Sequence, residues 1–197
     1  MNEVHVIYMK VTSKVTYGIV KAILEMKQFT QYFISKKKQA TFSLVNRIVN
    51  WFVSHGYIAK RARFYEVVSP VAILNLFPLY RKMKPFAVFD INLPNKEALK
   101  LLKAKGTFCL TTALSYYDEY YRDTAIYIYL EDKNLLEELK SMPKGYTHIE
   151  CYKDDLGSHD FVRKDHRQIT DKIRTIIDLF CANKTYAAER LIKKEWV

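Results

Sequence analysis

The stretch from residue 41 to residue 68, TFSLVNRIVNWFVSHGYIAKRARFYEVV, constrains the fold more than any other part of the chain. Apolar side chains recur along its first half at spacings of three and four, which predicts an amphipathic helix. The buried stripe of this helix would be Phe42, Val45, Ile48, Val49, Phe52 and Val53. Gly56 follows directly, and a glycine just past a helix end commonly closes the helix. The runs YIAK and RFYEVV come next, rich in β-branched and aromatic residues, and predict a β-hairpin.

The other face of this predicted helix carries short hydrogen-bonding side chains and no acidic residue. These polar residues are Ser43, Asn46, Arg47, Asn50 and Ser54. A helix face that only contacts solvent usually mixes Glu with Lys, whereas these groups can bond both to phosphates and to base edges. The pattern therefore favours a surface that reads a nucleic acid.

Two further helices are predicted before residue 41. One begins after Ser13, with Val15, Ile19, Ala22, Ile23 and Met26 on one face. The next covers residues 30–38, where a threonine can cap the first turn. It ends in three lysines, Lys36, Lys37 and Lys38, and the hairpin tip adds Lys60, Arg61 and Arg63.

Three helices followed by a basic hairpin are the plan of a winged helix-turn-helix. In that plan the third helix enters the major groove of DNA, and the hairpin tip lies along the backbone or the minor groove. An ordinary helical bundle with a solvated basic face is the alternative. We expect nucleic-acid binding, because the order of elements and the acid-free face both fit it.

Charge divides the 197-residue chain into two parts. Residues 1–85 hold 14 Lys and Arg against 3 Asp and Glu, whereas residues 86–197 hold 18 of each, so the whole excess of +11 lies in the first part. Such asymmetry is typical of one part that meets a polyanion and another with a different task. We therefore predict two domains, a winged helix-turn-helix over 1–85 and a mixed α/β domain over 86–197, and an α+β class for the whole chain.

The second part alternates between predicted helices and strands. Strands are expected over 85–93, 125–130 and 146–152, with an extended segment near residue 161. Helices are expected over 95–105, 107–117, 132–140 and 186–194. A short helix is expected before this part, over 71–83, where Pro78 would kink or shorten it. Thr170 and Asp171 form a cap before a further helix, whose buried positions are Ile173, Ile176, Ile177, Phe180 and Cys181.

Three blocks of the second part resemble a known family. They are GTFCLTTALSYYD (106–118), AIYIYLED (125–132) and RTIIDLFCANKTYAAERLIKK (174–194). These blocks look like those of the AbiEi family, the antitoxin and autorepressor components of abortive-infection toxin–antitoxin pairs. The resemblance implies an N-terminal winged helix that binds repeats in the promoter of its own operon. It also implies an α/β C-terminal domain that counteracts a nucleotidyltransferase-like toxin.

The sequence offers little that would support catalysis. The richest polar cluster, GSHDFVRKDH (157–166), lacks the ligand spacing of a zinc site, and we interpret it as a polar loop. Phosphate-binding glycine motifs and the serine-hydrolase motif are absent from the sequence. The three cysteines are odd in number and widely spaced, which predicts reduced core residues. We expect no enzyme activity, no cofactor and no metal.

The expected function is that of a sequence-specific DNA-binding regulator in the cytoplasm, without a membrane segment because no apolar run reaches about 18 residues. Double-stranded DNA is the expected partner, and the sequence leaves open a cognate toxin and a homodimer. One alternative is a winged-helix protein that binds RNA or shapes DNA without an operator. Another is an enzyme related to the nucleotidyltransferases.

Overall fold

The computed structural model of the chain describes residues 10–121, 123–156 and 160–196. It is a mixed α+β protein with two separate sheets, in agreement with the predicted class. The described residues form two compact units that divide between Tyr80 and Arg81, slightly before the boundary predicted at residue 85. We call residues up to Tyr80 the N-terminal unit and residues from Arg81 the C-terminal unit. Each unit is described by itself.

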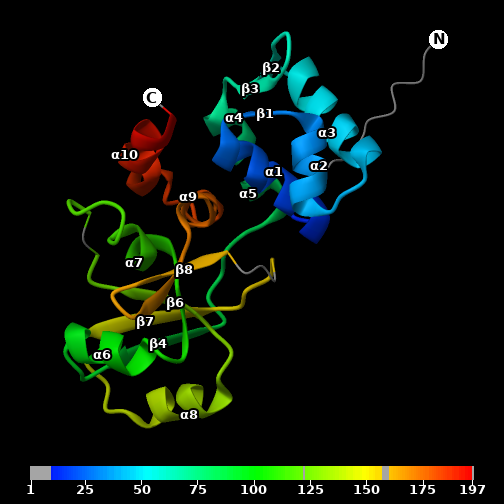
Figure 1. Ribbon diagram of the computed structural model, residues 1–197. Helices are drawn as coiled ribbons and strands as arrows, with labels where there is room; N and C mark the ends of the chain where they lie inside the picture. The colour runs from blue at the N-terminus through cyan, green and yellow to red at the C-terminus, as the bar shows by residue number, and fades with distance from the viewer. Residues whose placement is uncertain (1–9, 122, 157–159, 197) are drawn as a thin grey trace. The chain divides into compact units, whose positions relative to one another are not determined.

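The N-terminal unit consists of helices and a small antiparallel sheet (Figure 1). Its elements in chain order are α1 (Lys14–Met26), β1 (Gln28–Phe29), α2 (Gln31–Lys38), α3 (Phe42–Ser54), β2 (Ile58–Lys60), β3 (Tyr65–Val67), α4 (Pro70–Leu74) and α5 (Phe77–Tyr80). Helix α2 packs against both α1 and α3. Strand β3 lies between β1 and β2 and pairs with both of them in antiparallel register.

The predicted cap at Thr30 and the predicted helix stop at Gly56 are present in the structure, and Thr41 forms a second cap that was not predicted. The Thr30 hydroxyl accepts a hydrogen bond from the Phe33 amide, and Thr41 accepts one from Leu44, so both threonines cap a helix. Gly56 has a φ of +71°, a conformation that glycine adopts without steric cost. The chain can therefore turn sharply from α3 into β2.

Two residues of the predicted buried stripes are in fact exposed. Val15 and Phe42 each leave 52% of their surface accessible. Both lie in the first turn of their helices, α1 and α3, and the buried side chains of α1 and α3 begin further along. The inner positions of α3 are buried as predicted, at Val45, Ile48, Val49 and Phe52.

The C-terminal unit is built around one six-stranded mixed sheet, ordered β4-β7-β6-β5-β9-β8. The strands are β4 (Ala87–Ile91), β5 (Gly106–Phe108), β6 (Ile126–Leu130), β7 (Thr147–Tyr152), β8 (Phe161–Lys164) and β9 (Arg167–Thr170). The helices are α6 (Asn95–Leu102), α7 (Leu110–Leu114), α8 (Lys133–Ser141), α9 (Lys172–Cys181) and α10 (Thr185–Trp196). Parallel pairing joins β6 to β7 and β5 to β9, and the other neighbours are antiparallel.

The central strand β6 presents a different chemistry to each face of this sheet. Its Ile126, Ile128 and Leu130 enter an apolar core with side chains of α6 and α8. The alternate residues, Tyr127 and Tyr129, point to the other face, because side chains alternate along a strand. That face is where α9 packs, on the opposite side of the sheet from α6 and α8 (Figure 1).

The structure corrects two predicted helices, one in each unit. Residues 107–117, predicted as one helix, divide between β5 and the short helix α7. The reason is that Gly106 lies against β6, where a Cβ atom would be 2.4 Å from the Tyr129 carbonyl oxygen, so the backbone runs close to its neighbour as a strand. The helix predicted over 71–83, in the N-terminal unit, is interrupted before Pro78 and forms two short helices, α4 and α5.

A buried ionic cluster holds the base of α9 against the sheet. Asp178, which is completely buried, accepts hydrogen bonds from Arg174, at 2.9 Å, and from Tyr129, at 2.8 Å. The Arg81 guanidinium binds the same carboxylate at 2.7 Å and also reaches Asp155 at 2.9 Å. Burial alone would lower the pKa of Arg81, but the opposite charges around it raise it. Arg81 therefore remains charged and is an integral part of the C-terminal unit.

Candidate nucleic-acid interface

The N-terminal unit places the polar face of α3 on the surface. Ser43, Arg47 and Asn50 are exposed and Asn46 is half-buried. The Asn50 side-chain amide donates a hydrogen bond to the side-chain oxygen of Asn46, Oδ1, at 3.1 Å, one turn earlier. These groups therefore share one face of the helix, and the amide pair holds the two asparagines in a common orientation beside Arg47.

A short turn joins α2 to α3. Gln39 ends α2 in the left-handed region with a φ of 49°, and the Ser35 hydroxyl donates a hydrogen bond to the Ala40 carbonyl at 2.7 Å. Thr41 then caps α3. The turn is thus fixed by side-chain bonds at both ends, and it sets the angle at which α3 leaves α2.

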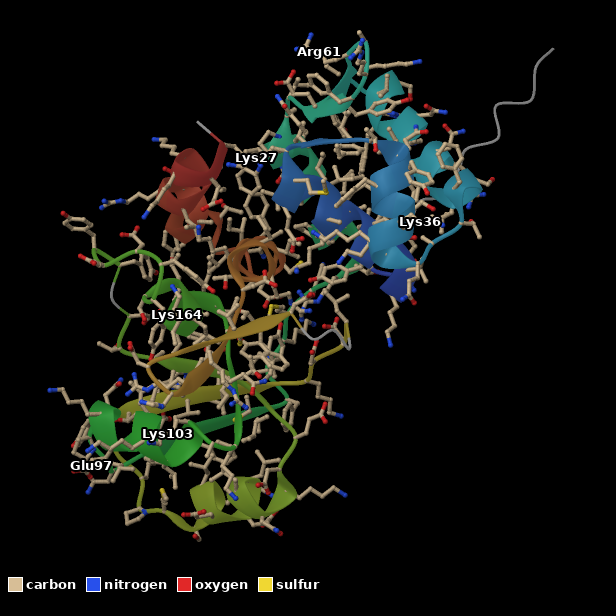
Figure 2. The ribbon with its side chains drawn as sticks, in the orientation of Figure 1. Lys27, Lys36, Arg61, Glu97, Lys103 and Lys164 are labelled. Atoms are coloured by element: carbon tan, nitrogen blue, oxygen red, sulfur yellow. The ribbon has the colours of Figure 1, made fainter. Side chains whose placement is uncertain are left out.

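The three lysines at the end of α2 do not act as one group. The Lys37 ammonium lies 3.5 Å from Glu25 of α1, and the aliphatic stem of Lys38 lies near Gly18 of the same helix. Lys36 instead lies over the ring of Tyr32, at 5.6 Å from its centroid, and is exposed (Figure 2). Lys36 accordingly contacts a ring of its own helix, and its side chain is exposed.

The hairpin between β2 and β3 also divides its cations. Arg61, at its tip in Figure 2, binds Glu66 through Nε at 2.8 Å and Nη2 at 2.7 Å. The Arg61 hydrogen bond, with a second from Gln28, lowers the pKa of the Glu66 carboxyl, so the pair stays ionised. Lys60 and Arg63 are exposed, and neither forms an ion pair within residues 10–80. Arg61 therefore stabilises the hairpin, while Lys60 and Arg63 leave their charge available.

Acidic residues in this unit are few and already engaged. Over residues 10–80 the sequence has two, Glu25 and Glu66. Glu25 binds Lys21 and Lys37, and Glu66 binds Arg61. Residues 10–80 contain no further acid that could neutralise the remaining cations, so this part of the unit presents a positive surface to a partner.

The aromatic end of α3 is a feature that the sequence interpretation did not identify. The Trp51 and His55 rings stack at 3.9 Å between centroids, and the Tyr57 ring contacts both of them. His55 also places Nδ1 2.8 Å from the Trp51 carbonyl oxygen. Residues four apart are neighbours on a helix surface, so the spacing of Trp51 and His55 is the sequence signal that could have predicted this contact. This cluster stiffens the junction between α3 and the hairpin.

The described residues offer little for catalysis or metal binding. Within the described ranges, no group of three or more His, Cys, Asp or Glu residues could hold a metal ion. All three cysteines are buried and free, as predicted. Burial raises the pKa of the Cys181 thiol to about 11, so it stays protonated and inert. The polar segment 157–166 is not simply the loop that we interpreted it as, because Phe161–Lys164 forms strand β8. Its residues Gly157, Ser158 and His159 lie outside the described residues.

Comparisons with known proteins identify no relative. No protein-family model, no curated protein and no solved structure matches the chain. Over the part of the chain that the structure describes, no helix has both the length and the apolar character needed to cross a membrane.

Proposed function

We propose that the N-terminal unit is a winged helix-turn-helix that binds double-stranded DNA. The observation that carries this proposal is the acid-free face of α3, where Arg47 and Asn50 are exposed beside Asn46. The order of elements, α1-β1-α2-α3-β2-β3, with β3 central in its sheet, is consistent with that fold. Arginine and asparagine are the side chains best suited to bidentate bonds with guanine and adenine in the major groove.

In this proposal α3 reads bases and the hairpin contacts the backbone. Lys60 and Arg63 have exposed charges and would replace condensed counterions at phosphates. Ser43, near the capped start of α3, would bond a phosphate as the helix enters the groove. Lys36 would contact the backbone from α2. Arg61 would act indirectly, since its bond to Glu66 holds the shape of the hairpin.

For the whole chain we propose a transcriptional regulator of the AbiEi type that represses its own operon. The C-terminal unit, whose charges nearly balance, would counteract a nucleotidyltransferase-like toxin. This part of the proposal rests on the sequence resemblance. It is tested by co-expression with the product of a neighbouring toxin gene, where growth should be rescued by the full chain. Failure to rescue would leave a DNA-binding regulator without an antitoxin role.

The test of base reading uses fluorescence anisotropy with the chain's own upstream DNA and an unrelated duplex of equal length. Arg47→Ala and Asn50→Ala should each narrow the ratio of the two affinities by about 5- to 150-fold, equivalent to about 1–3 kcal/mol for one bidentate contact. The control is a triple variant with Lys96, Lys133 and Lys144 changed to Ala, which removes three exposed cations of the C-terminal unit. Equal weakening on both duplexes would mean that α3 contacts only phosphates, as in an architectural protein. Tighter binding to RNA than to either duplex would overturn the proposal.

The test of the hairpin measures the salt dependence of binding. The double variant Lys60→Ala/Arg63→Ala leaves the Arg61–Glu66 pair in place, so the hairpin should keep its shape. Each lost phosphate contact should lower the slope of log K against log salt by about 0.9, so the double variant should lose about 1.8. An unchanged slope would remove the hairpin from the interface.

A further inference from the structure

A concave site, separate from the surface of α3, lies on the C-terminal unit over the sheet face that carries Tyr129. It has a volume of about 760 Å³, which is in the range of small-molecule sites. Its floor is formed by Thr107 of β5, Tyr129 of β6 and Gln168 of β9. The Gln168 amide donates a hydrogen bond to the Thr107 hydroxyl at 2.8 Å. The floor is therefore polar and fixed by the sheet itself.

Cations from two separate segments line this pocket. Lys103 and Lys105 follow α6, and Arg163 projects from β8 (Lys103 is labelled in Figure 2). Lys105 is bound to Asp132 at 3.3 Å, but neither Lys103 nor Arg163 forms an ion pair within the described ranges of the unit. Two exposed cations that reach one pocket from separate segments can bind the same anionic group.

The pocket also contains acidic side chains, and whether they are neutralised decides the net charge that a ligand would meet. Asp154 forms an ion pair with the buried Arg174 at 3.0 Å, so the negative charge of this carboxylate is already neutralised by the arginine. Glu131 is exposed at the edge of the pocket. The cations outnumber the acids that remain uncompensated, and the site therefore favours an anion over a cation.

The turn between β8 and β9 places a histidine at the pocket. Asp165 and His166 both adopt positive φ, at 48° and 60°. Two consecutive positive φ values define the hairpin turn that usually takes Asn-Gly, so the chain accepts a less favourable backbone here. His166 lines the pocket from this turn and adds a ring nitrogen on the same side as Arg163.

The space exceeds what a single phosphate group needs. Phe161, at the start of β8, lines the pocket with 38% of its surface exposed. Aromatic rings stack on nucleobases, and the side chains of Thr107 and Gln168 offer hydrogen bonds to the edge of a planar ring. Phosphate-binding cations, an aromatic wall and polar edge groups thus occur in one cavity.

We propose that this pocket of the C-terminal unit binds a nucleoside phosphate. Arg163 and Lys103 hold the phosphate groups, with His166 as a further donor. Phe161 packs against the base, and Gln168 bonds to its edge. The proposal concerns a site separate from the surface of α3, and it stands or falls independently of DNA binding.

The experiment is isothermal titration of the full chain with ADP, pyrophosphate and adenosine. ADP should bind saturably and more tightly than either of the other two, because each of them makes only part of the contacts. Arg163→Gln and Lys103→Gln should each weaken ADP at least about tenfold, the effect of losing one charge-assisted bond. Phe161→Ala should weaken ADP and leave pyrophosphate unchanged.

The matched control tests whether ADP binds non-specifically to the basic N-terminal unit and not to the pocket. Lys60→Ala/Arg63→Ala removes two exposed cations there and should leave ADP binding unchanged. All the substituted side chains are exposed, so the variants should fold, and circular dichroism checks this. The proposal would be overturned if ADP showed no saturable binding at concentrations up to about 1 mM, the weak end of measurable affinities. Equal affinity for pyrophosphate and ADP, or loss of ADP binding in the control variant, would overturn it as well.

Discussion

Replacing Arg81 by Met should destabilise the C-terminal unit strongly although the residue lies at its chain start. Met approximates the length of the side chain but leaves the Asp178 carboxylate, which is completely buried, without its bond at 2.7 Å. Removing one partner of a buried ion pair costs about 3–5 kcal/mol. We expect the lower end, about 3 kcal/mol, because Arg174 and Tyr129 still bond to Asp178. The bond to Asp155 adds little, since that side chain is 52% exposed.

The measurement is urea unfolding followed by tryptophan fluorescence. The chain has two tryptophans, Trp51 in α3 and Trp196 in α10, so a Trp51→Phe background makes the signal report on the C-terminal unit. The matched control is Lys82→Met, next in sequence and exposed, which should change stability by no more than about 0.5 kcal/mol. A loss below about 1 kcal/mol in Arg81→Met would refute the reasoning. Coupling to Asp178→Asn in a double-mutant cycle then identifies the pair as the cause.

The same contact decides where the chain can be cut. A fragment of residues 81–197 keeps Arg81 and the hydrogen bond from the Met83 amide to the Cys181 carbonyl oxygen. A fragment of residues 86–197, cut at the boundary predicted from charge, loses both. We expect the longer fragment to unfold cooperatively and the shorter one to be weaker by about 3 kcal/mol or more. Equal stability of the two would contradict the assignment of Arg81 to this unit.

Three further substitutions test other contacts. Gly106→Ala should lower the free energy of unfolding by about 3 kcal/mol, the upper end for overpacking, because its Cβ atom would lie 2.4 Å from a carbonyl oxygen of β6. Gly18→Ala in α1 has room for the added methyl group and should raise the free energy of unfolding by about 0.5–1 kcal/mol. Urea unfolding measures both effects. The Nδ1 group of His148 donates a hydrogen bond to the Asp90 carboxylate at 2.7 Å, which raises the pKa of the histidine, although some burial lowers it. A raised pKa gives stability that is complete below the ordinary value of about 6.5 and is lost as pH rises through the folded value. His148→Gln should thus lower stability by about 0.5 kcal/mol near pH 5 and by nothing near pH 9, and an equal loss at both would assign the effect to packing.

Much of the N-terminal unit could be predicted because its signals are local. The helix caps at Thr30 and Thr41 and the turn at Gly56 depend on residues within four positions of one another. Strand β1 was not predicted, since two residues carry no periodicity and pair only when β3 is in place. Likewise the pairing of Arg61 with Glu66 spans the hairpin, so sequence inspection alone counted Arg61 as an available cation.

The buried ionic cluster could not be predicted for a related reason. Arg174 and Asp178 are four residues apart in a helix that otherwise reads as apolar, and that spacing alone suggests an ordinary surface pair. Their burial depends on Arg81, which lies 97 positions from Asp178 in the chain, and on a tyrosine of β6. Periodicity assigns a residue to a face of its own helix, but it does not identify a distant partner.

Charge in this protein serves two purposes that the total of +11 does not distinguish. In the C-terminal unit, Arg81 and Arg174 both bind the buried carboxylate of Asp178 and stabilise the fold. In the N-terminal unit both acids of residues 10–80 are already paired, so Arg47 and Arg63 remain uncompensated at the surface. A positive residue is therefore informative about partners only after its internal bonds are known. That separation is the reason for testing Lys60 and Arg63 together while leaving Arg61 intact.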